Sequence, residues 1–285
     1  MKRIDLHIHT LSSDGLNTKE EIINKACELG LDMISITDHD VLNTEYLEDK
    51  RIKVIPGIEL SATAPIGIYH ILGLFFKDNC DFRYILEASD KNRNAVTQLR
   101  EDVDNKLINE FSKKQLVDLN EYNSFKNNRN PLKGEQYKFN ARDYVIEKGL
   151  CKDINDYWDR LIPEIFPNGH GCTFSGYVSA KEAIEAIRKS GGIAIMAHPT
   201  ERLVDFGVSL DDTIKAGTEL GIDGYECIHY SASEEKRKIL IDWCRNNNMY
   251  ITCGSDYHGG KAGIKFGYSD EEYSCTKIPM LNKEI

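Results

Sequence analysis

The chain has 285 residues, 41% of them hydrophobic and 29% charged, a composition typical of globular proteins. Its net charge of −10 disfavours a protein that grips nucleic acid through a broad basic face, yet permits one that binds a small phosphate ester through metal ions. No apolar run approaches the roughly 18 residues that span a bilayer, and no charged-then-apolar leader precedes the first strand pattern. We therefore expect a cytoplasmic protein without membrane contact.

Residues 3–10 alternate between apolar and polar side chains, which predicts a strand. Ile4, Leu6 and Ile8 fall on one face, whereas Asp5, His7 and His9 fall on the other. Two imidazoles one pleat apart on the same face are a suitable geometry for two ligands of one metal ion. The stretch alone does not exclude a purely structural pair of histidines.

The next segments alternate between helix and strand. Thr18 and Glu21 form a capping box before an apolar helical stripe that ends at Gly30. Strands are expected at residues 33–37, 53–61 and 68–76, with a short helix near residues 43–49 and a turn at residues 62–67. This rhythm predicts an α/β fold with a mainly parallel sheet.

The rhythm is interrupted over residues 78–176, which are polar, rich in Asn and Lys, and helical in pattern. We expect a long helix over residues 85–111, a loop over residues 120–134, and short helices at residues 141–149 and 154–161. This segment is interpreted as a helical insert or lid within a discontinuous domain formed by residues 1–77 and 177–285.

The α/β pattern resumes with a second capping box, Ser179 and Glu182. Strands are predicted at residues 193–197, 224–227 and 250–253, and helices at residues 211–220 and 233–246. With the first four, these make seven strands.

Polar side chains with metal-binding chemistry recur where the predicted strands end: His7, His9, Asp14, Asp38, His39, Glu59, His70, His198, Asp256 and His258. Because the carboxyl ends of parallel strands lie at one face, we expect these residues to converge. Their mixture of imidazoles and carboxylates suits Zn, Mn or Fe(II). Their number exceeds what one ion needs and indicates two or three divalent ions.

Several members of this set have simpler interpretations. Asp5 and Asp38 can act by orienting ligands through hydrogen bonds. Asp14 next to Gly15 is also typical of an ordinary turn, Glu59 of a helix cap, and His70 of a core histidine. The convergence of all these residues in one place is what would distinguish the two readings.

The motifs DLHIHT, ITDHD, PGIE, AHP and GSDYHG occur in this order and resemble the PHP (polymerase and histidinol phosphatase) superfamily of metal-dependent phosphoesterases. The resemblance implies a distorted (β/α)7 TIM-like barrel with a di- or trinuclear metal site. It implies one ion held by His7, His9, Glu59 and Asp256, a second by Glu59, His70 and His198, and a third by Asp14, His39 and His258.

The split arrangement around the insert resembles the tryptophan-operon H-type, or nucleoside 3′,5′-bisphosphate phosphatase, branch, which also contains 5′-3′ exoribonucleases. This implies hydrolysis of a phosphomonoester of a small nucleotide, of the AMP or 3′,5′-bisphosphonucleotide type, by a metal-activated water. Arg93 and Arg142 in the insert are candidate phosphate contacts. His229 is a candidate substrate contact or acid for the leaving group.

Three alternatives remain open: an exoribonuclease acting on short oligonucleotides, a histidinol-phosphate-type phosphatase, and a non-catalytic metal-binding scaffold. The expected partner is a small phosphorylated substrate rather than long nucleic acid. The sequence leaves the oligomeric state undetermined.

Overall fold

Two five-stranded sheets organise the part of the molecule that carries the predicted ligands. In the computed structural model of the chain, the described residues are 3–44, 48–49, 51–77, 79–128, 140–167, 176–259 and 266–269. The chain divides into two compact units, one formed by Met1–Asn92 with Tyr177–Ile285 and the other by Arg93–Gly176. The proposed boundary at residue 78 thus differs from the observed division, because the first turns of helix α2 (Arg83–Lys113) belong to the first unit.

The first sheet has the order β10-β1-β2-β4-β3. Its strands are β1 (Arg3–Asp5), β2 (Met33–Ser35), β3 (Glu48–Asp49), β4 (Ile52–Ile55) and β10 (Tyr268–Ser269). The three central strands β1, β2 and β4 run parallel, and the edge strands β10 and β3 run antiparallel to their neighbours. The predicted short helix near residues 43–49 is wrong where the structure describes the chain, because Asn43 bridges Gly57 and residues 48–49 form β3.

The second sheet has the order β5-β6-β7-β8-β9. Its strands are β5 (Ile58–Thr63), β6 (Ile68–Leu74), β7 (Ile193–Met196), β8 (Gly224–Ile228) and β9 (Tyr250–Cys253). Strands β7, β8 and β9 are parallel, whereas β6 runs antiparallel to both of its neighbours, β5 and β7. The expectation of a mainly parallel sheet is wrong for this half, because β5 and β6 are joined by a tight hairpin rather than by a helical crossover.

The predicted strand over residues 53–61 is in fact two strands that belong to different sheets. Pro56 cannot donate to a ladder, so it ends β4. A side chain on Gly57 would lie 2.2 Å from the hydroxyl of Ser35, so only glycine allows this close approach. The chain passes from the first sheet to the second at these two residues, directly before Glu59.

The two sheets meet through isolated bridges rather than through a continuous ladder. Ile8 bridges Tyr257, and His39 bridges Glu59, both in parallel sense. Leu6 also donates its N–H to the carbonyl of Cys253 at 3.2 Å. The described strands therefore form a mixed α/β arrangement of two joined sheets and no continuous closed barrel.

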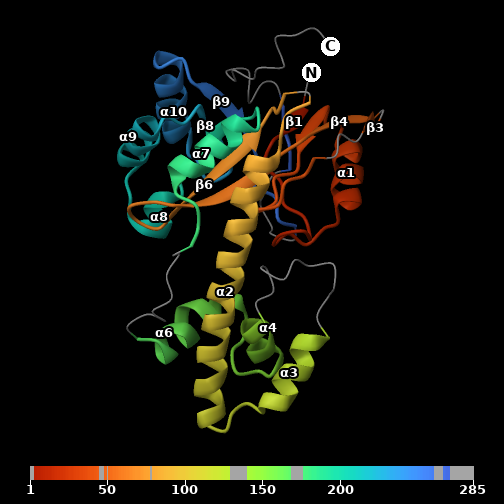
Figure 1. Cartoon of the computed structure of the whole chain (residues 1–285), viewed down its shortest axis with the longest axis vertical. Helices are drawn as coiled ribbons and strands as arrows, with labels where there is room; N and C mark the ends of the chain where they lie inside the picture. The colour runs from red at the N-terminus through yellow and green to blue at the C-terminus, as the bar shows by residue number, and fades with distance from the viewer. Residues whose placement is uncertain are drawn as a thin grey trace. The chain divides into compact units, whose positions relative to one another are not determined.

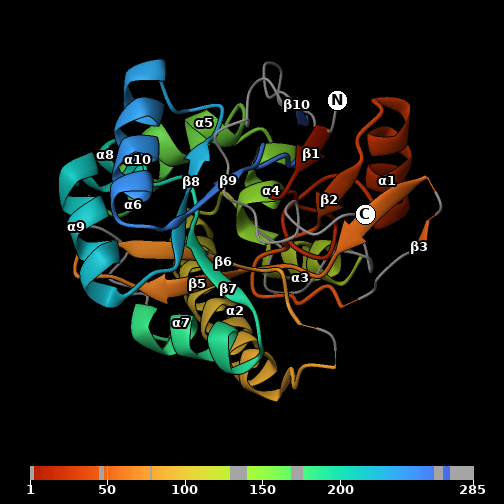
Figure 2. The same cartoon turned by 90° about the horizontal axis from the view of Figure 1, so that it is seen from above.

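Helices pack on the outer faces of both sheets (Figure 2). Helix α1 (Lys19–Glu28) begins at the predicted capping box and buries Ile22, Ile23 and Ala26 against the first sheet. Helices α7 (Ala180–Lys189), α9 (Leu210–Leu220) and α10 (Glu234–Asn246) contribute to the core over the second sheet. Each fully buried aliphatic side chain contributes about 1.5–3 kcal/mol. The apolar packing of these helices stabilises the two sheets. The ends of the strands can then carry polar side chains.

The second unit is helical and has its own apolar core, which includes Leu107, Phe111, Tyr144 and Tyr157. Besides the rest of α2, its helices are α3 (Leu119–Asn127), α4 (Asn140–Glu147), α5 (Ile154–Asp156), the π-helical turn η2 (Tyr157–Leu161) and α6 (Ile162–Ile165) (Figure 1). The loop predicted over residues 120–134 is wrong up to Asn127, because Asp118 caps α3 by accepting the N–H of Glu121 at 2.9 Å. No helix among the described residues is long and apolar enough to cross a membrane.

Candidate metal centre

The nine side chains predicted as metal ligands lie together in the first unit. They form overlapping groups in which the possible ligand atoms lie within 4.8 Å of one another: His9, Asp14, His39 and His258; His7, His9, Glu59 and Asp256; His39, Glu59 and His70; and His198, Glu201 and Asp256. These residues lie in or just after strands β1, β2, β5, β6, β7 and β9, as their order in the chain predicts. We call them, without Glu201, the ligand cluster.

Glu59 lies at the centre of the ligand cluster and is fully buried. Its Oε2 lies 3.3 Å from Nε2 of His7 and 3.2 Å from Nε2 of His9. Its Oε1 lies 3.3 Å from Nδ1 of His70 and 3.2 Å from Nε2 of His198. The two oxygens of one carboxylate therefore face two different sets of imidazoles, which is the arrangement of a bridging ligand.

Hydrogen bonds orient the rings of His7 and His9 toward the cluster. Nδ1 of His7 lies 3.1 Å from Oε1 of Glu226, an atom that can only accept from it. Nδ1 of His9 lies 3.3 Å from the hydroxyl of Ser13, whose proton is donated to Asp38 at 2.6 Å. In the neutral rings, Nδ1 therefore carries the proton, and Nε2 presents its lone pair to the cluster.

The same arrangement recurs at His198 and His258. Nδ1 of His198 lies 3.5 Å from Oε2 of Glu201, and Nδ1 of His258 lies 2.8 Å from the backbone carbonyl of Asp256. An imidazole held through one nitrogen by an acceptor, with the other nitrogen directed inward, is typical of metal-ligating histidines. Glu201 is an ion-pair partner of the outer nitrogen of His198 and also belongs to one of the possible ligand groups.

The charge of the site favours bound cations. Five carboxylates lie in or directly against the cluster: Asp14, Glu59, Glu201, Glu226 and Asp256. Within the described part of the chain their ion-pair partners are histidines, with no Lys or Arg among them. Among the described residues, the buried atoms Oε2 of Glu59 and Oδ1 of Asp14 also have no hydrogen-bond partner. Divalent cations would neutralise this charge and occupy both oxygens, so the donor set fits metal binding.

Without a cation, protons would have to perform this role. Burial lowers the pKa of His9, but Asp256 and Glu59 outweigh burial and raise it to about 10. Burial likewise raises the pKa of Glu59, but the surrounding imidazoles hold it well below its ordinary value. Protons and metal ions therefore compete for the same imidazole nitrogens.

The backbone at two of the ligands is strained. His198 and Asp256 have positive φ angles of 27° and 51°, a region that non-glycine residues enter at a cost of about 1–3 kcal/mol. Glu226 accepts the N–H of His198 at 2.8 Å, and Asp5 accepts the N–H of Ser255 at 3.0 Å. Strain of this kind is common at functional sites, where surrounding hydrogen bonds maintain it.

A comparison with protein-family models matches residues 5–157, more than half of the chain, to the model described as PHP domain. The chain belongs to the PHP domain family. The family expected from the motifs is thereby confirmed.

Curated relatives of this PHP chain carry names of different phosphoester chemistries. It is 26% identical to a 5′-3′ exoribonuclease of Haemophilus influenzae, with 99% of each chain covered. It is 25% identical to a phosphoribosyl 1,2-cyclic phosphate 1,2-diphosphodiesterase of Eggerthella lenta, covering 92% of this chain and 95% of that one. It is 23% identical to a 3′,5′-nucleoside bisphosphate phosphatase of Chromobacterium violaceum, covering 95% and 93%.

A solved structure from Bifidobacterium adolescentis, described as a metal-dependent phosphoesterase, superimposes with a TM-score of 0.68 at 21% identity and covers 98% of both chains. This likeness concerns the fold. It extends over both units of the PHP chain.

The three predicted substrate contacts of the PHP chain have different surroundings. The His229 ring is buried beside His198, with a distance of 5.8 Å between the ring centroids. Arg93 and Arg142 belong to the second unit, where Nε of Arg142 donates to Asp143 at 2.8 Å. The two arginines stay predictions.

His229 differs from the other histidines in its tautomer. Its Nδ1 accepts the N–H of Ser231 at 3.3 Å, so the proton of the neutral ring resides on Nε2. Within the described part of the chain, Nε2 has no hydrogen-bond partner. Burial lowers the pKa of His229 to about 4. At neutral pH this ring is a hydrogen-bond donor rather than an imidazolium acid.

Sequence reasoning did not identify Glu226 and Glu201 as supports of the site. Glu226 is a fully buried acid in the otherwise apolar strand β8. That anomaly was the available signal, because a buried carboxylate requires partners. Glu201, three residues after His198, offered no comparable pattern.

Proposed function

We propose that this chain hydrolyses a phosphomonoester of a small nucleotide, of the AMP or 3′,5′-bisphosphonucleotide type. The proposal builds on the membership of this chain in the PHP domain family, which indicates a metal-dependent phosphoester hydrolase. The observation that carries it is the position of Glu59, whose two carboxylate oxygens face separate groups of imidazoles. With its oxygens placed in this way, Glu59 would contribute a ligand atom to each of two ions, and such ions would activate water and neutralise charge on a phosphate.

The proposed ligand sets are those expected from the motifs. His7, His9, Glu59 and Asp256 would hold one ion, Glu59, His70 and His198 a second, and Asp14, His39 and His258 a third. Zn, Mn and Fe(II) suit these nitrogen and oxygen donors. Such ions supply a nucleophilic water at neutral pH and neutralise charge on the phosphate oxygens.

The protein's own side chains would orient the reacting groups. Asp38 orients His9 through the hydroxyl of Ser13, and Glu226 contacts His7 directly. Glu201 pairs with Nδ1 of His198. The Nε2–H of His229 is a candidate donor to a phosphate or leaving-group oxygen. Arg93 and Arg142 are candidate contacts for a phosphate, because a guanidinium pairs with it bidentately.

The size of the substrate is inferred from charge. With a net charge of −10, extended contact with an RNA backbone is disfavoured, which supports a mononucleotide over a long strand. The nucleoside bisphosphate phosphatase among the relatives supports the same choice. The exoribonuclease among them supports trimming of short oligonucleotides as the second candidate.

The arrangement of the two sheets also supports a finer description of the fold. We propose that they represent a distorted (β/α)7 barrel interrupted at the two junctions. The bridges Ile8–Tyr257 and His39–Glu59 support this description, because each joins an end strand of one sheet to the other sheet.

A substrate panel tests the function. Metal-free protein reloaded with Mn, Zn or Fe(II) would be assayed on AMP, a 3′,5′-bisphosphonucleotide, histidinol phosphate, a cyclic phosphodiester and a short 5′-phosphorylated RNA. We expect metal-dependent phosphate release that is fastest from a mononucleotide. Faster cleavage of the RNA would favour the exoribonuclease, and inactivity of the metal-loaded protein on all five would favour a scaffold.

A further inference from the structure

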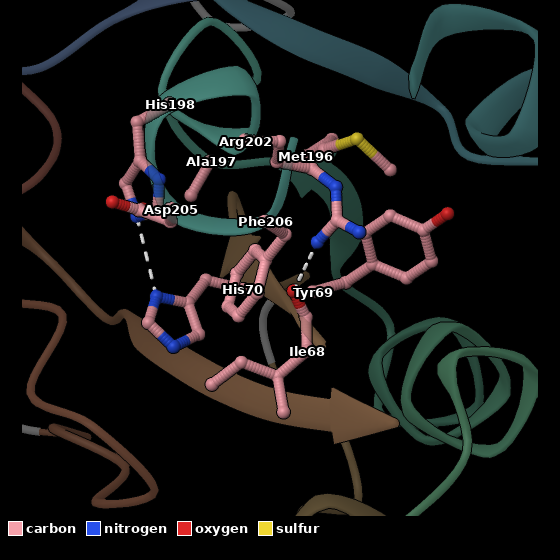
Figure 3. A pocket seen from close by; sticks show the side chains of 9 residues that line it. All are labelled: Ile68, Tyr69, His70, Met196, Ala197, His198, Arg202, Asp205 and Phe206. Atoms are coloured by element: carbon pink, nitrogen blue, oxygen red, sulfur yellow. Dashed lines mark hydrogen bonds between the residues drawn. The ribbon is translucent and has the colours of Figure 1, made fainter. Parts of the chain in front are cut away.

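The short helix α8 (Arg202–Phe206) follows directly after His198 and packs on the turn that precedes His70. The guanidinium of Arg202 donates from Nη2 to the carbonyl of Ile66 at 2.7 Å and from Nη1 to the carbonyl of Ile68. It lies over the ring of Tyr69, with 4.2 Å between Cζ and the ring centroid. Figure 3 shows Arg202 with Ile68 and Tyr69 and, beside them, His70 facing His198.

A second contact fastens the same helix to the same turn. Phe206 packs over Gly67, which has a φ of +68°, so closely that a side chain at residue 67 would lie 2.3 Å from the ring. Arg202 itself is only 5% exposed. A buried arginine that donates to the carbonyls of two residues on either side of Gly67 is held in one orientation, since a misplaced guanidinium would leave its charge unsolvated.

The sheet alone does not fix this part of β6. The ladder between β6 and β7 pairs residues Ile71 to Leu74 with Met196 to Ile193. Ile68 and Tyr69 lie beyond it and pair only with β5. Strand β7 therefore does not pair with Ile68, and Arg202 supplies a hydrogen-bond donor to the carbonyl of that residue.

We propose that Arg202 is a positioning residue for the metal position formed by Glu59, His70 and His198, an inference that rests on the proposed function. Arg202 joins the segment that carries His198 to the segment that carries His70. Nδ1 of His70 and Nε2 of His198 lie 3.3 Å apart, so a small displacement of either segment changes their common geometry. Arg202 bonds Ile66 and Ile68 and lies over Tyr69. The position formed by Asp14, His39 and His258 draws on other segments and should therefore not depend on Arg202.

The test compares Arg202→Lys with Arg188→Lys in the full-length chain. Lysine keeps the charge but cannot donate to two carbonyls in a fixed fork. Arg188 is the control, because its guanidinium donates to the carbonyl of Gly221 and to the carboxylate of Asp223, neither of which belongs to the ligand cluster. Bound Mn²⁺ would be counted by elemental analysis after dialysis, its affinity measured by calorimetry, and folding checked by thermal melting.

We expect Arg202→Lys to lower the affinity for one Mn²⁺ ion by at least about tenfold, as loss of a supporting group typically does. Arg188→Lys should leave the affinity for every Mn²⁺ ion unchanged. Unchanged binding of every ion in Arg202→Lys, or equal weakening of all ions, would overturn the inference. Absence of Mn²⁺ binding by the unmodified protein would overturn the proposed function as well, so the two failures are distinguishable.

A double-mutant comparison identifies the position involved. When Arg202→Lys is added to His70→Ala, the affinities for the remaining Mn²⁺ ions should equal those of His70→Ala alone, because the affected position is already lost. When Arg202→Lys is added to His258→Ala, the affinity for one of the remaining Mn²⁺ ions should still fall about tenfold. The opposite pattern would place the effect of Arg202 elsewhere and contradict the inference.

Discussion

Oε1 of Glu226 lies 3.1 Å from Nδ1 of His7, and both side chains are fully buried. The other oxygen of the same carboxylate accepts the backbone N–H of His198 at 2.8 Å. One acid in strand β8 thus supports a ligand from each sheet. Its position explains how residues separated by about two-thirds of the chain keep a common geometry.

Glu226→Gln should weaken metal binding. Glutamine can accept from His7 or donate to it, so the ring is no longer forced to present the lone pair of Nε2 to the cluster. We expect metal affinity to fall about 10- to 100-fold, measured by calorimetry with Zn²⁺ or Mn²⁺. Equal affinity of Glu226→Gln and unmodified protein would show that this carboxylate does not orient His7.

Asp256→Ala should abolish phosphate release while the protein stays folded. The carboxylate lies 3.3 Å from Nε2 of His7 and 3.1 Å from Nε2 of His9, so its loss removes a proposed ligand. Activity in the presence of excess metal is the measurement, and turnover close to that of unmodified protein would contradict the metal assignment.

Asn92→Ala should destabilise the first unit. The amide of Asn92 donates to Oδ1 of Asp40 at 2.7 Å and to the carbonyl of Ser61 at 2.6 Å, and its oxygen accepts the N–H of Val178 at 2.8 Å. Leaving these buried groups unpaired should lower the free energy of unfolding by about 2–4 kcal/mol. Denaturant titration would measure the change.

Asn94→Ala is the matched control for Asn92, since Asn94 is exposed on the same helix. It should change the free energy of unfolding by less than about 0.5 kcal/mol. Equal effects of the two substitutions would mean that the hydrogen bonds of Asn92 do not stabilise the unit.

Asp104→Asn should stabilise the second unit at neutral pH. Burial raises the pKa of Asp104 from 3.8 to about 6, so ionisation costs more in the folded than in the unfolded state. The contribution of neutral Asp104 to the free energy of unfolding is therefore fully present below about pH 4 and is lost as the pH rises through 6. Asparagine avoids this loss, which amounts to at most about 3 kcal/mol at pH 7.5.

The gain should disappear near pH 4, where Asp104 is neutral in both states. Unfolding of Asp104→Asn and of the exposed-site control Asp102→Asn would be measured at pH 4 and pH 7.5. A gain of the same size at both pH values would show that ionisation of Asp104 is not its cause.

The sequence by itself determined the chemistry of the site. The alternation of residues 3–10 and the polar residues after later strands, together with the resemblance of the motifs, identified nine side chains that the structure brings into overlapping groups. The capping boxes at Thr18 and Ser179 likewise predicted where α1 and α7 begin. These features are local, because strand periodicity and helix capping depend on residues close together in the chain.

Only the tertiary structure decided the direction of the strands and the supports of the ligands. The passage from β4 to β5 at Pro56 and Gly57 and the β5–β6 hairpin depend on close packing against Ser35 and on pairing between strands. The contacts of Glu226 with His7 and of Arg202 with Ile66 join residues far apart in the sequence. Such contacts arise when separate elements pack together, and no short-range pattern encodes them.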